Sequence, residues 1–268
     1  MASTTTLLGV MAMSGAPDAT DAPDRLLHFS RFLFALGTAE VWYVHAMAPS
    51  GEHLAVAGAF TAVAAATWLR ATRSWQCGAA AAAWLAHVAL RFPYTANHEY
   101  LILICFALLA LTGPSAEGAR DVVAALRWLV ALGFFWAGAQ KILFGCYFHG
   151  EVLAAAASQT ERFGLVLRPF LGSPLFPVLS NLCYALEIAV AVLLIARRTR
   201  VCGLWFGVGF LVVIEVAARE AFFGGLMIGL LLLFDSGRRD RLALVPLGLL
   251  YAYMVVAATG YAPLMELH

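Results

Sequence analysis

Long apolar runs, separated by short segments rich in Arg, Pro and Gly, dominate the hydropathy pattern of this chain. Such runs predict helices that enter a bilayer. They cover residues 26–48, 54–70, 75–92, 99–113, 122–145, 175–196, 201–218, 220–235 and 242–262. The fourth, seventh and eighth runs are shorter than the roughly 20 residues of a full span, so we expect eight or nine transmembrane helices.

Composition points to the same fold class. Hydrophobic residues make up 62% of the chain and charged residues 12%, with a mean hydropathy of +0.83. These values lie outside the range of soluble domains and predict an all-α, polytopic integral membrane bundle surrounded by membrane lipid. A formal net charge of +1, with scattered arginines, excludes nucleic acid as a partner.

The first 24 residues differ from the rest of the chain. They are rich in Ala, Ser, Thr and Asp and lack a basic start, which predicts a disordered arm and argues against a signal peptide. Residues 25–268 are then expected to form one transmembrane helical domain. Five cysteines are widely spaced without a CxxC motif and indicate neither a disulfide scaffold nor a zinc site.

Arginines in the predicted connections orient the bundle, because cytoplasmic loops collect positive charge. With the N-terminus in the cytoplasm, the inner connections hold Arg70, Arg73, Arg120, Arg197, Arg198, Arg200, Arg238, Arg239 and Arg241. The outer connections hold few, except for the long segment 146–173, whose sequence could form an amphipathic helix in the interface. This orientation places Asn97, His98 and Lys141 toward the outer face.

Lys141 is the only lysine in the chain, and it ends the apolar stretch 126–143. An ionisable group at membrane depth costs about 2.5–3.5 kcal/mol on insertion scales, so it usually faces a partner, a cavity or a reaction. Arginine keeps its proton, whereas lysine can lose one when it is desolvated and then act as a base. The alternative is that Lys141 reaches along the helix to the outer headgroups.

Three segments resemble a known family. Asn97-His98-Glu99-Tyr100-Leu101 is similar to an Asn-His-x-Tyr-Leu motif, and Ala137-Gly138-Ala139-Gln140-Lys141 is similar to an Ala-Gly-x-x-Lys helix. Residues 182–234 resemble a Glu-containing helix followed by a basic turn and a Phe-rich hairpin. These are features of the horizontally transferred transmembrane (HTTM) family, which contains vitamin K-dependent γ-glutamyl carboxylase and bacterial relatives.

The resemblance implies a carboxylase-like or quinol-oxidising enzyme, of lyase or oxidoreductase type, in a bacterial inner membrane. Lys141 matches the family's catalytic base, which deprotonates reduced vitamin K or a related quinol so that oxygen can attack. The resulting strong base would take a γ-proton from glutamate, and carbon dioxide would trap the carbanion. His98 matches a second catalytic residue, which orients the substrate, and Glu187 matches a buried acid.

Further residues are expected to bind the quinol-type substrate or cofactor. Asn97 belongs to the His98 motif, and Glu187 matches the acid of the later helix. Phe134, Phe135 and Trp136, beside the lysine, are candidates for the wall of a quinone pocket. Gly138 would let another helix or a flat ligand approach closely.

Two features differ from the carboxylases of this family. The family's Phe-His pair is replaced by Gly209-Phe210-Leu211, with Glu215 four residues later, and the large extramembrane domain that follows the helices in carboxylases has no counterpart before His268. An alternative is therefore a non-enzymatic accessory protein for the maturation or immunity of a secreted peptide. A third is a subunit of a larger membrane complex.

Other polar residues have structural interpretations. Four histidines expected near the outer face lack the HxxxH or HxH spacing of metal sites, so no metal is predicted; they are His45, His53, His98 and His149. Three glutamates lie inside apolar runs, where a free carboxylate is costly; they are Glu40, Glu187 and Glu215. Each is expected to be protonated, hydrogen-bonded, or paired with Lys141 or an arginine.

Overall fold

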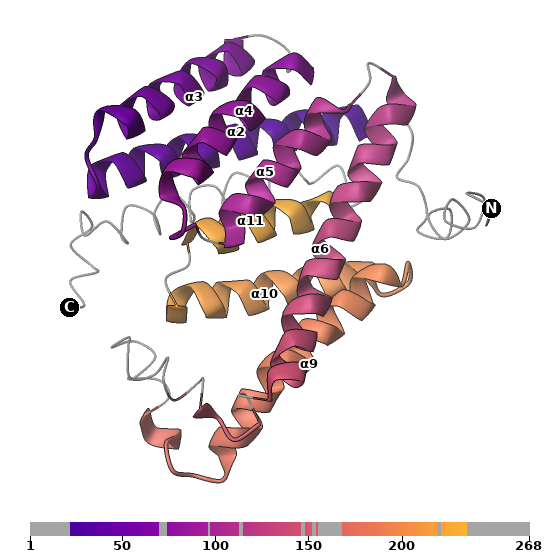
Figure 1. Ribbon diagram of the computed structural model, residues 1–268. Coiled ribbons are helices and arrows are strands. Elements are labelled where there is room, and N and C mark those ends of the chain that lie inside the picture. The colour runs from indigo at the N-terminus through magenta and orange to yellow at the C-terminus, as the bar shows by residue number, and fades with distance from the viewer. Residues whose placement is uncertain are drawn as a thin grey trace, which may run out of the picture. The chain divides into compact units, whose positions relative to one another are not determined.

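A computed structural model describes residues 22–69, 74–95, 97–112, 115–145, 148–151, 154, 168–218 and 221–234, and these residues form helices without a β-strand (Figure 1). The α-helices are α2 (Ala22–Met47), α3 (Gly51–Leu69), α4 (Ser74–Arg91), α5 (Asn97–Ala110), α6 (Ala116–Phe144), α9 (Leu175–Ile195), α10 (Arg200–Ala218) and α11 (Ala221–Leu231). Two short 3₁₀ helices are η1 (Arg168–Phe170) and η2 (Leu232–Phe234). The all-α prediction is confirmed for the described part of the chain.

Eight of the predicted helices correspond to observed ones. Six of them match α2, α3, α4, α5, α9 and α10 within a few residues at either end. The largest difference is at α6, which begins at Ala116, six residues before the predicted 122, because its first polar turn continues the same helix. The ninth predicted helix, 242–262, lies outside the described residues, as do residues 1–21 of the predicted arm and most of the predicted interfacial segment.

Two of these helices, α6 and α9, are long and apolar enough to cross a membrane. Three further apolar stretches are shorter: Asn97–Ala110, Arg200–Ile214 and Phe222–Phe234. At 1.5 Å per residue the 14 residues of α5 extend about 21 Å, less than the roughly 30 Å of a hydrocarbon core. The segments that the sequence marked as short are short in the structure as well.

The chain divides into two compact units, residues 1–127 and 128–268, with the boundary inside α6. In the first unit, α2 packs on α3, α3 on α4 and α4 on α5, and α2 also contacts α5. In the second unit, α9 packs on α10 and α10 on α11. Helices that follow each other in the sequence are thus neighbours in space, as short connections favour.

An aromatic cluster forms the core of the first unit. Phe34, Phe60, Trp84 and Phe106 come from α2, α3, α4 and α5, and all four are fully buried. Ring centroids lie 5.0 Å apart for Phe34 and Phe106 and 5.4 Å apart for Phe60 and Trp84, within the range of favourable aromatic pairs. The cluster needs glycine at position 37, because a Cβ there would lie 2.7 Å from Phe60 Cζ.

Small residues set the helix spacing in the second unit. A Cβ on Gly138 of α6 would lie 2.9 Å from the backbone oxygen of Tyr184 and 2.7 Å from Ile188 Cγ1, both on α9. A Cβ on Gly203 of α10 would lie 2.9 Å from backbone atoms of Leu193. Gly138 was expected to admit a helix or a flat ligand, and in the structure it admits a helix, since it is buried against α9.

Gly138→Ala should destabilise the second unit, by about 1–3 kcal/mol, because the new methyl group meets backbone that must shift. Gly133→Ala on the same helix is the matched control, since a Cβ there would contact only Met227 Cε, at an ordinary 3.9 Å. Thermal unfolding of both variants in detergent measures the difference. Equal melting temperatures for the two variants would contradict the close contact between α6 and α9.

Candidate functional site

Polar side chains gather in two buried clusters, one in each unit. The second unit contains Lys141 and Glu187, and the first contains Glu40, Arg91, His98 and Glu99. The sequence predicted one site holding both Lys141 and His98. The structure places these two residues in different units, each with an acidic partner of its own.

Lys141 in the last turn of α6 is ion-paired with Glu187 in the middle of α9. The Nζ atom donates to both carboxylate oxygens, at 2.6 Å from Oε1 and 2.7 Å from Oε2. The side chains of Lys141 and Glu187 are 20% and 8% exposed. The lysine therefore faces α9, and the prediction that Glu187 pairs with Lys141 or an arginine is confirmed.

Local sequence explains why this pair forms. The buried residues of α9 include Ser180, Glu187, Ala191 and Leu194, at spacings that put the carboxylate on the helix's packed face. Beyond Lys141, α6 ends at Phe144 and is followed by Gly145, whose φ of 71° is the left-handed conformation with which many helices end.

A hydrogen-bonded turn holds the end of α6 against α9. Asn181 Nδ2 donates to the backbone oxygen of Phe148 at 3.0 Å, and Tyr184 Oη donates to Asn181 Oδ1 at 2.7 Å. The ring of Tyr184 also packs edge-on against that of Phe148. Sequence reasoning missed Asn181 and Tyr184, although they lie six and three residues before Glu187, within two helical turns.

The aromatic residues before Lys141 point in different directions. Phe134 precedes the lysine by seven residues, which is two turns, so it shares the lysine's face of α6; it is 3% exposed. Phe135 and Trp136 are 46% and 56% exposed and lie roughly 120–140° around the helix from Lys141. Of the three predicted pocket residues, the structure thus brings Phe134 to the face of the lysine, whereas Phe135 and Trp136 are on other faces.

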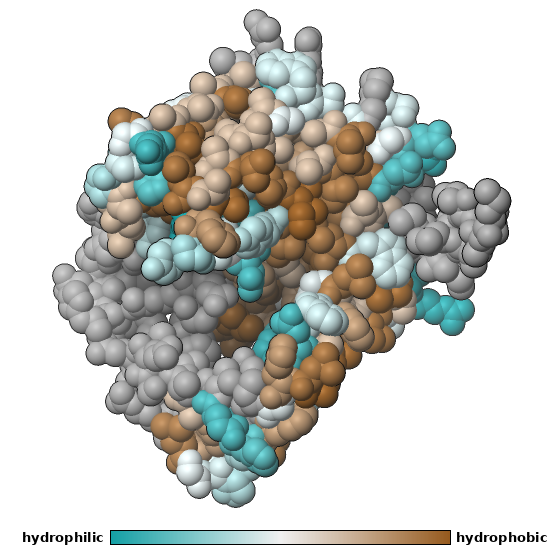
Figure 2. Space-filling view, in the orientation of Figure 1, coloured by the Kyte–Doolittle hydropathy of each residue, from teal (hydrophilic) through white to brown (hydrophobic). Residues whose placement is uncertain are grey.

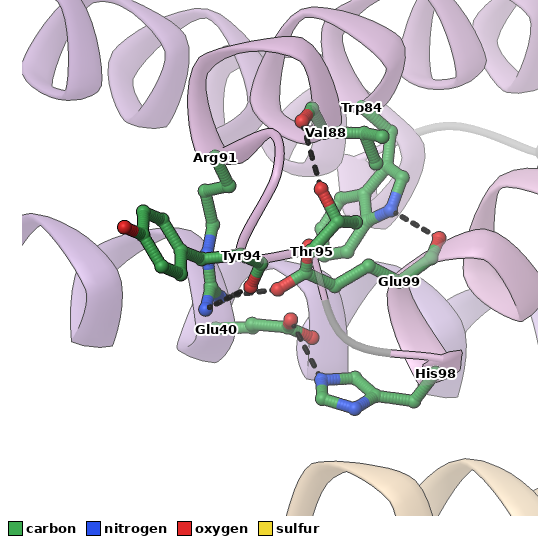
Figure 3. Close-up of polar contacts among 8 residues, drawn as sticks. All are labelled: Glu40, Trp84, Val88, Arg91, Tyr94, Thr95, His98 and Glu99. Atoms are coloured by element: carbon green, nitrogen blue, oxygen red, sulfur yellow. Dashed lines mark hydrogen bonds and ion pairs between the residues drawn. The ribbon is translucent and has the colours of Figure 1, made fainter.

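In the first unit, two acidic residues are buried beside two basic ones (Figure 3). His98 Nε2 lies 2.9 Å from Glu40 Oε1, a contact in which the imidazole donates to the carboxylate. Arg91 forms an ion pair with Glu99. Trp84 Nε1 donates to the backbone oxygen of Glu99 at 2.8 Å and anchors the start of α5. Glu40 and Glu99 are 1% and 0% exposed.

Helical periodicity places both carboxylates inside. On α2, Glu40 continues the buried series of Leu33, Gly37 and Val44. On α5, Glu99 begins the buried series that includes Ile102 and Phe106. In the sequence, each glutamate lies three or four residues from apolar residues that turn out to be buried on the same helix face. This spacing could be interpreted only once the structure showed which face of each helix is buried.

The connection between α4 and α5 brings Arg91 to Glu99. Thr95 Oγ1 donates to the backbone oxygen of Val88 at 3.2 Å, which folds the connection back over the end of α4. Arg91 Nη2 lies 3.5 Å from the backbone oxygen of Tyr94 (Figure 3). Asn97, a predicted binding residue, is exposed at the start of α5.

The four histidines considered for a metal site are placed differently. His53 Nδ1 lies 2.9 Å from the backbone oxygen of Ala48, His45 packs edge-on against Trp42, and His149 is exposed. Among the described residues, possible metal-ligand atoms come together at His98, where one atom each from Glu40, His98 and Glu99 lie within 4.8 Å of one another.

Glu215, the third glutamate expected inside an apolar run, has a side chain that lies outside the described residues.

Comparison of the chain with protein-family models, with curated proteins and with solved structures found no match. The family suggested by the sequence motifs accordingly enters the interpretation as a proposal.

Lys141→Met should lower stability by about 3 kcal/mol, because it breaks a buried ion pair and leaves the carboxylate of Glu187 without its ammonium partner. Lys141→Met combined with Glu187→Leu should recover most of that loss, since an apolar pair avoids desolvating charge. Melting temperatures of the wild type, both single variants and the double variant measure the coupling between the two positions. Additive losses would contradict a direct interaction.

Proposed function

We propose that the chain is a multi-pass membrane protein with eight or nine transmembrane helices and a cytoplasmic N-terminus, in a bacterial-type inner membrane. The two long apolar helices support this, as does the surface (Figure 2), where hydrophobic residues cover much of the visible face. Large apolar side chains are exposed in the middle of helices, including Leu85 at 55%, Leu132 at 56% and Val192 at 57%. Lipid is the solvent in which such surfaces are favourable.

Within this framework, the function that the site supports best is that of an HTTM-type enzyme with a quinol-type substrate, in which Lys141 is the general base. The observation that carries the proposal is the buried Lys141–Glu187 pair. A lone lysine inside an apolar bundle is costly, and a carboxylate that contacts it through both oxygens provides it with a proton acceptor.

Glu187 has a specific role in this mechanism. Before Lys141 can accept a proton, its Nζ must give one up, and Glu187 Oε1 at 2.6 Å is the nearest acceptor that the structure shows. Transfer of that proton leaves a neutral amine and a neutral carboxylic acid, which a low-dielectric site favours over separated charges. The amine then takes the proton of a substrate hydroxyl and becomes an ammonium ion, and the substrate becomes an oxyanion.

A reduced quinone would supply the acidic hydroxyl and the electrons for oxygen chemistry. The neutral amine of Lys141 fits such a group because it can receive the phenolic proton, while Glu187 holds the proton that the ammonium gave up. To reset the pair, Glu187 must release its proton, and the partial exposure of the Lys141 side chain, 20%, provides a route for it.

By its resemblance to the family motif, His98 would be a positioning residue. The contact between His98 Nε2 and the buried Glu40 within the first unit supports this role, because a fixed acceptor sets the orientation of an imidazole. Asn97 precedes it on the exposed first turn of α5.

Lys141→Arg should reduce oxygen-dependent oxidation of reduced vitamin K by about 100-fold or more, because arginine keeps the ion pair with Glu187 but cannot give up its proton. Epoxide formation by purified protein in lipid nanodiscs is the measurement. Gln140→Leu is the matched control, since residue 140 is exposed and adjacent in the same helix.

Unchanged turnover by folded Lys141→Arg would remove Lys141 from the mechanism. Absence of epoxide from folded wild type would overturn the enzymatic proposal and favour a role in secreted-peptide maturation or immunity, or in a larger membrane complex.

His98→Ala should reduce the same turnover by less than the lysine change does, with the larger effect on KM, if His98 only positions the substrate. His98→Gln should restore part of the activity, because the amide can still donate to Glu40. A loss in kcat as large as that of Lys141→Arg would instead give His98 a direct part in the chemistry.

A further inference from the structure

The cluster of Glu40, Arg91, His98 and Glu99 in the first unit brings together three side chains that can bind a metal ion. Glu40 on α2 and His98 and Glu99 on α5 each direct one metal-ligand atom into a space where these atoms lie within 4.8 Å of one another. We infer that Glu40, His98 and Glu99 form a binding site for one divalent transition-metal ion.

The distance between His98 and Glu40 fits direct coordination. With ligand atoms about 2.0–2.2 Å from the metal, two neighbouring ligands are roughly 3.4 Å apart at the tetrahedral angle of zinc sites and roughly 3.0 Å apart at the right angle of octahedral sites. His98 Nε2 and Glu40 Oε1 are 2.9 Å apart. A metal ion can therefore take the place of the proton between these two atoms with small side-chain movements, while α2 and α5 keep their packing.

A second observation at Glu40 points independently to a ligand. Its Oε2 atom is buried and has no hydrogen-bond partner among the described residues, and the whole residue is 1% exposed. Figure 3 shows the Glu40 carboxylate between the His98 ring and the carboxylate of Glu99. A buried carboxylate oxygen without a donor costs free energy, and a metal ion bound in this space would satisfy it.

Arg91 and Trp84 support this site from outside. The ion pair with Arg91 orients the Glu99 side chain, and the hydrogen bond from Trp84 holds the backbone at Glu99. Metal-binding carboxylates commonly have such a second partner, because each carboxylate can accept several bonds. Two carboxylates share this space with one guanidinium and one imidazole, and a bound cation would interact favourably with both carboxylates.

The ligand types narrow the choice of metal. Two carboxylates with one imidazole suit Mn²⁺, Fe²⁺ or Zn²⁺, whereas Mg²⁺ and Ca²⁺ prefer oxygen ligands alone. Three protein ligands leave coordination positions for water or a substrate. The His98 side chain is 17% exposed, which gives such a ligand access to the site. The site uses no atom of the Lys141–Glu187 pair and does not depend on the proposed enzymatic activity.

Metal-free protein in nanodiscs, prepared with a chelator, would be titrated with Mn²⁺ alone while the free ion is followed by electron paramagnetic resonance. We expect one tightly bound Mn²⁺ per chain, displaced by Zn²⁺, and a higher melting temperature with the ion than without it. Glu40→Gln and His98→Gln should each weaken binding at least tenfold. If Glu40→Gln does not fold, His98→Gln still tests the site, because the His98 side chain is partly exposed and its replacement disturbs the core less.

Two controls separate this site from others. Glu187→Gln alters the second unit's cluster and should bind Mn²⁺ as the wild type does. The triple variant His45→Gln, His53→Gln and His149→Gln removes other histidines and should also retain the bound ion. Absence of a bound ion in the folded wild type, or equal binding by His98→Gln, would overturn the inference. Turnover that is lost in Lys141→Arg, in wild-type protein that binds no Mn²⁺, would leave the proposed function intact while the metal site fails.

Discussion

The structure depends on the cost of burying a carboxylate among apolar helices. Glu40, Glu99 and Glu187 are almost inaccessible, and each lies against a basic group from another part of the chain. All three contacts join different helices: α2 to α5, α6 to α9, and α4 to the start of α5. A buried ion pair adds little net stability, but removing one partner from it costs much more, because a buried charge is then left unpaired. These contacts therefore specify which helix faces meet.

Close packing without bulky side chains makes these contacts possible. Gly138 lets α6 approach the backbone of α9, and Lys141, one turn later, then reaches Glu187. In the first unit, Gly37 accommodates Phe60 and Trp84, one turn before Glu40. In both units a glycine on the contact face precedes the ionisable residue by three positions. The spacing places the small residue and the ionisable one on the same face of the helix.

The two clusters differ in the chemistry that they favour. In the second unit one ammonium contacts one carboxylate through both oxygens, an arrangement suited to passing a proton between two groups. In the first unit two carboxylates converge with an imidazole, and one carboxylate oxygen has no hydrogen-bond partner among the described residues. A buried carboxylate oxygen of this kind suits a cation. The proton-transfer proposal thus rests on Lys141 and Glu187, and the metal-site proposal on Glu40, His98 and Glu99.

The sequence by itself determined the helices, because the length of each apolar run and the polar residues that separate the runs are local properties. It also singled out Lys141 as the residue that needs a partner. It could list Glu187 as a candidate partner, but only the tertiary structure decided that Lys141 faces α9, since helical phase is unreadable in a uniformly apolar run. Likewise, Glu40, Arg91 and Glu99 come from separate stretches, and no spacing motif relates residues 40 and 99. Their convergence depends on how α2, α4 and α5 pack, a non-local property that hydropathy does not encode.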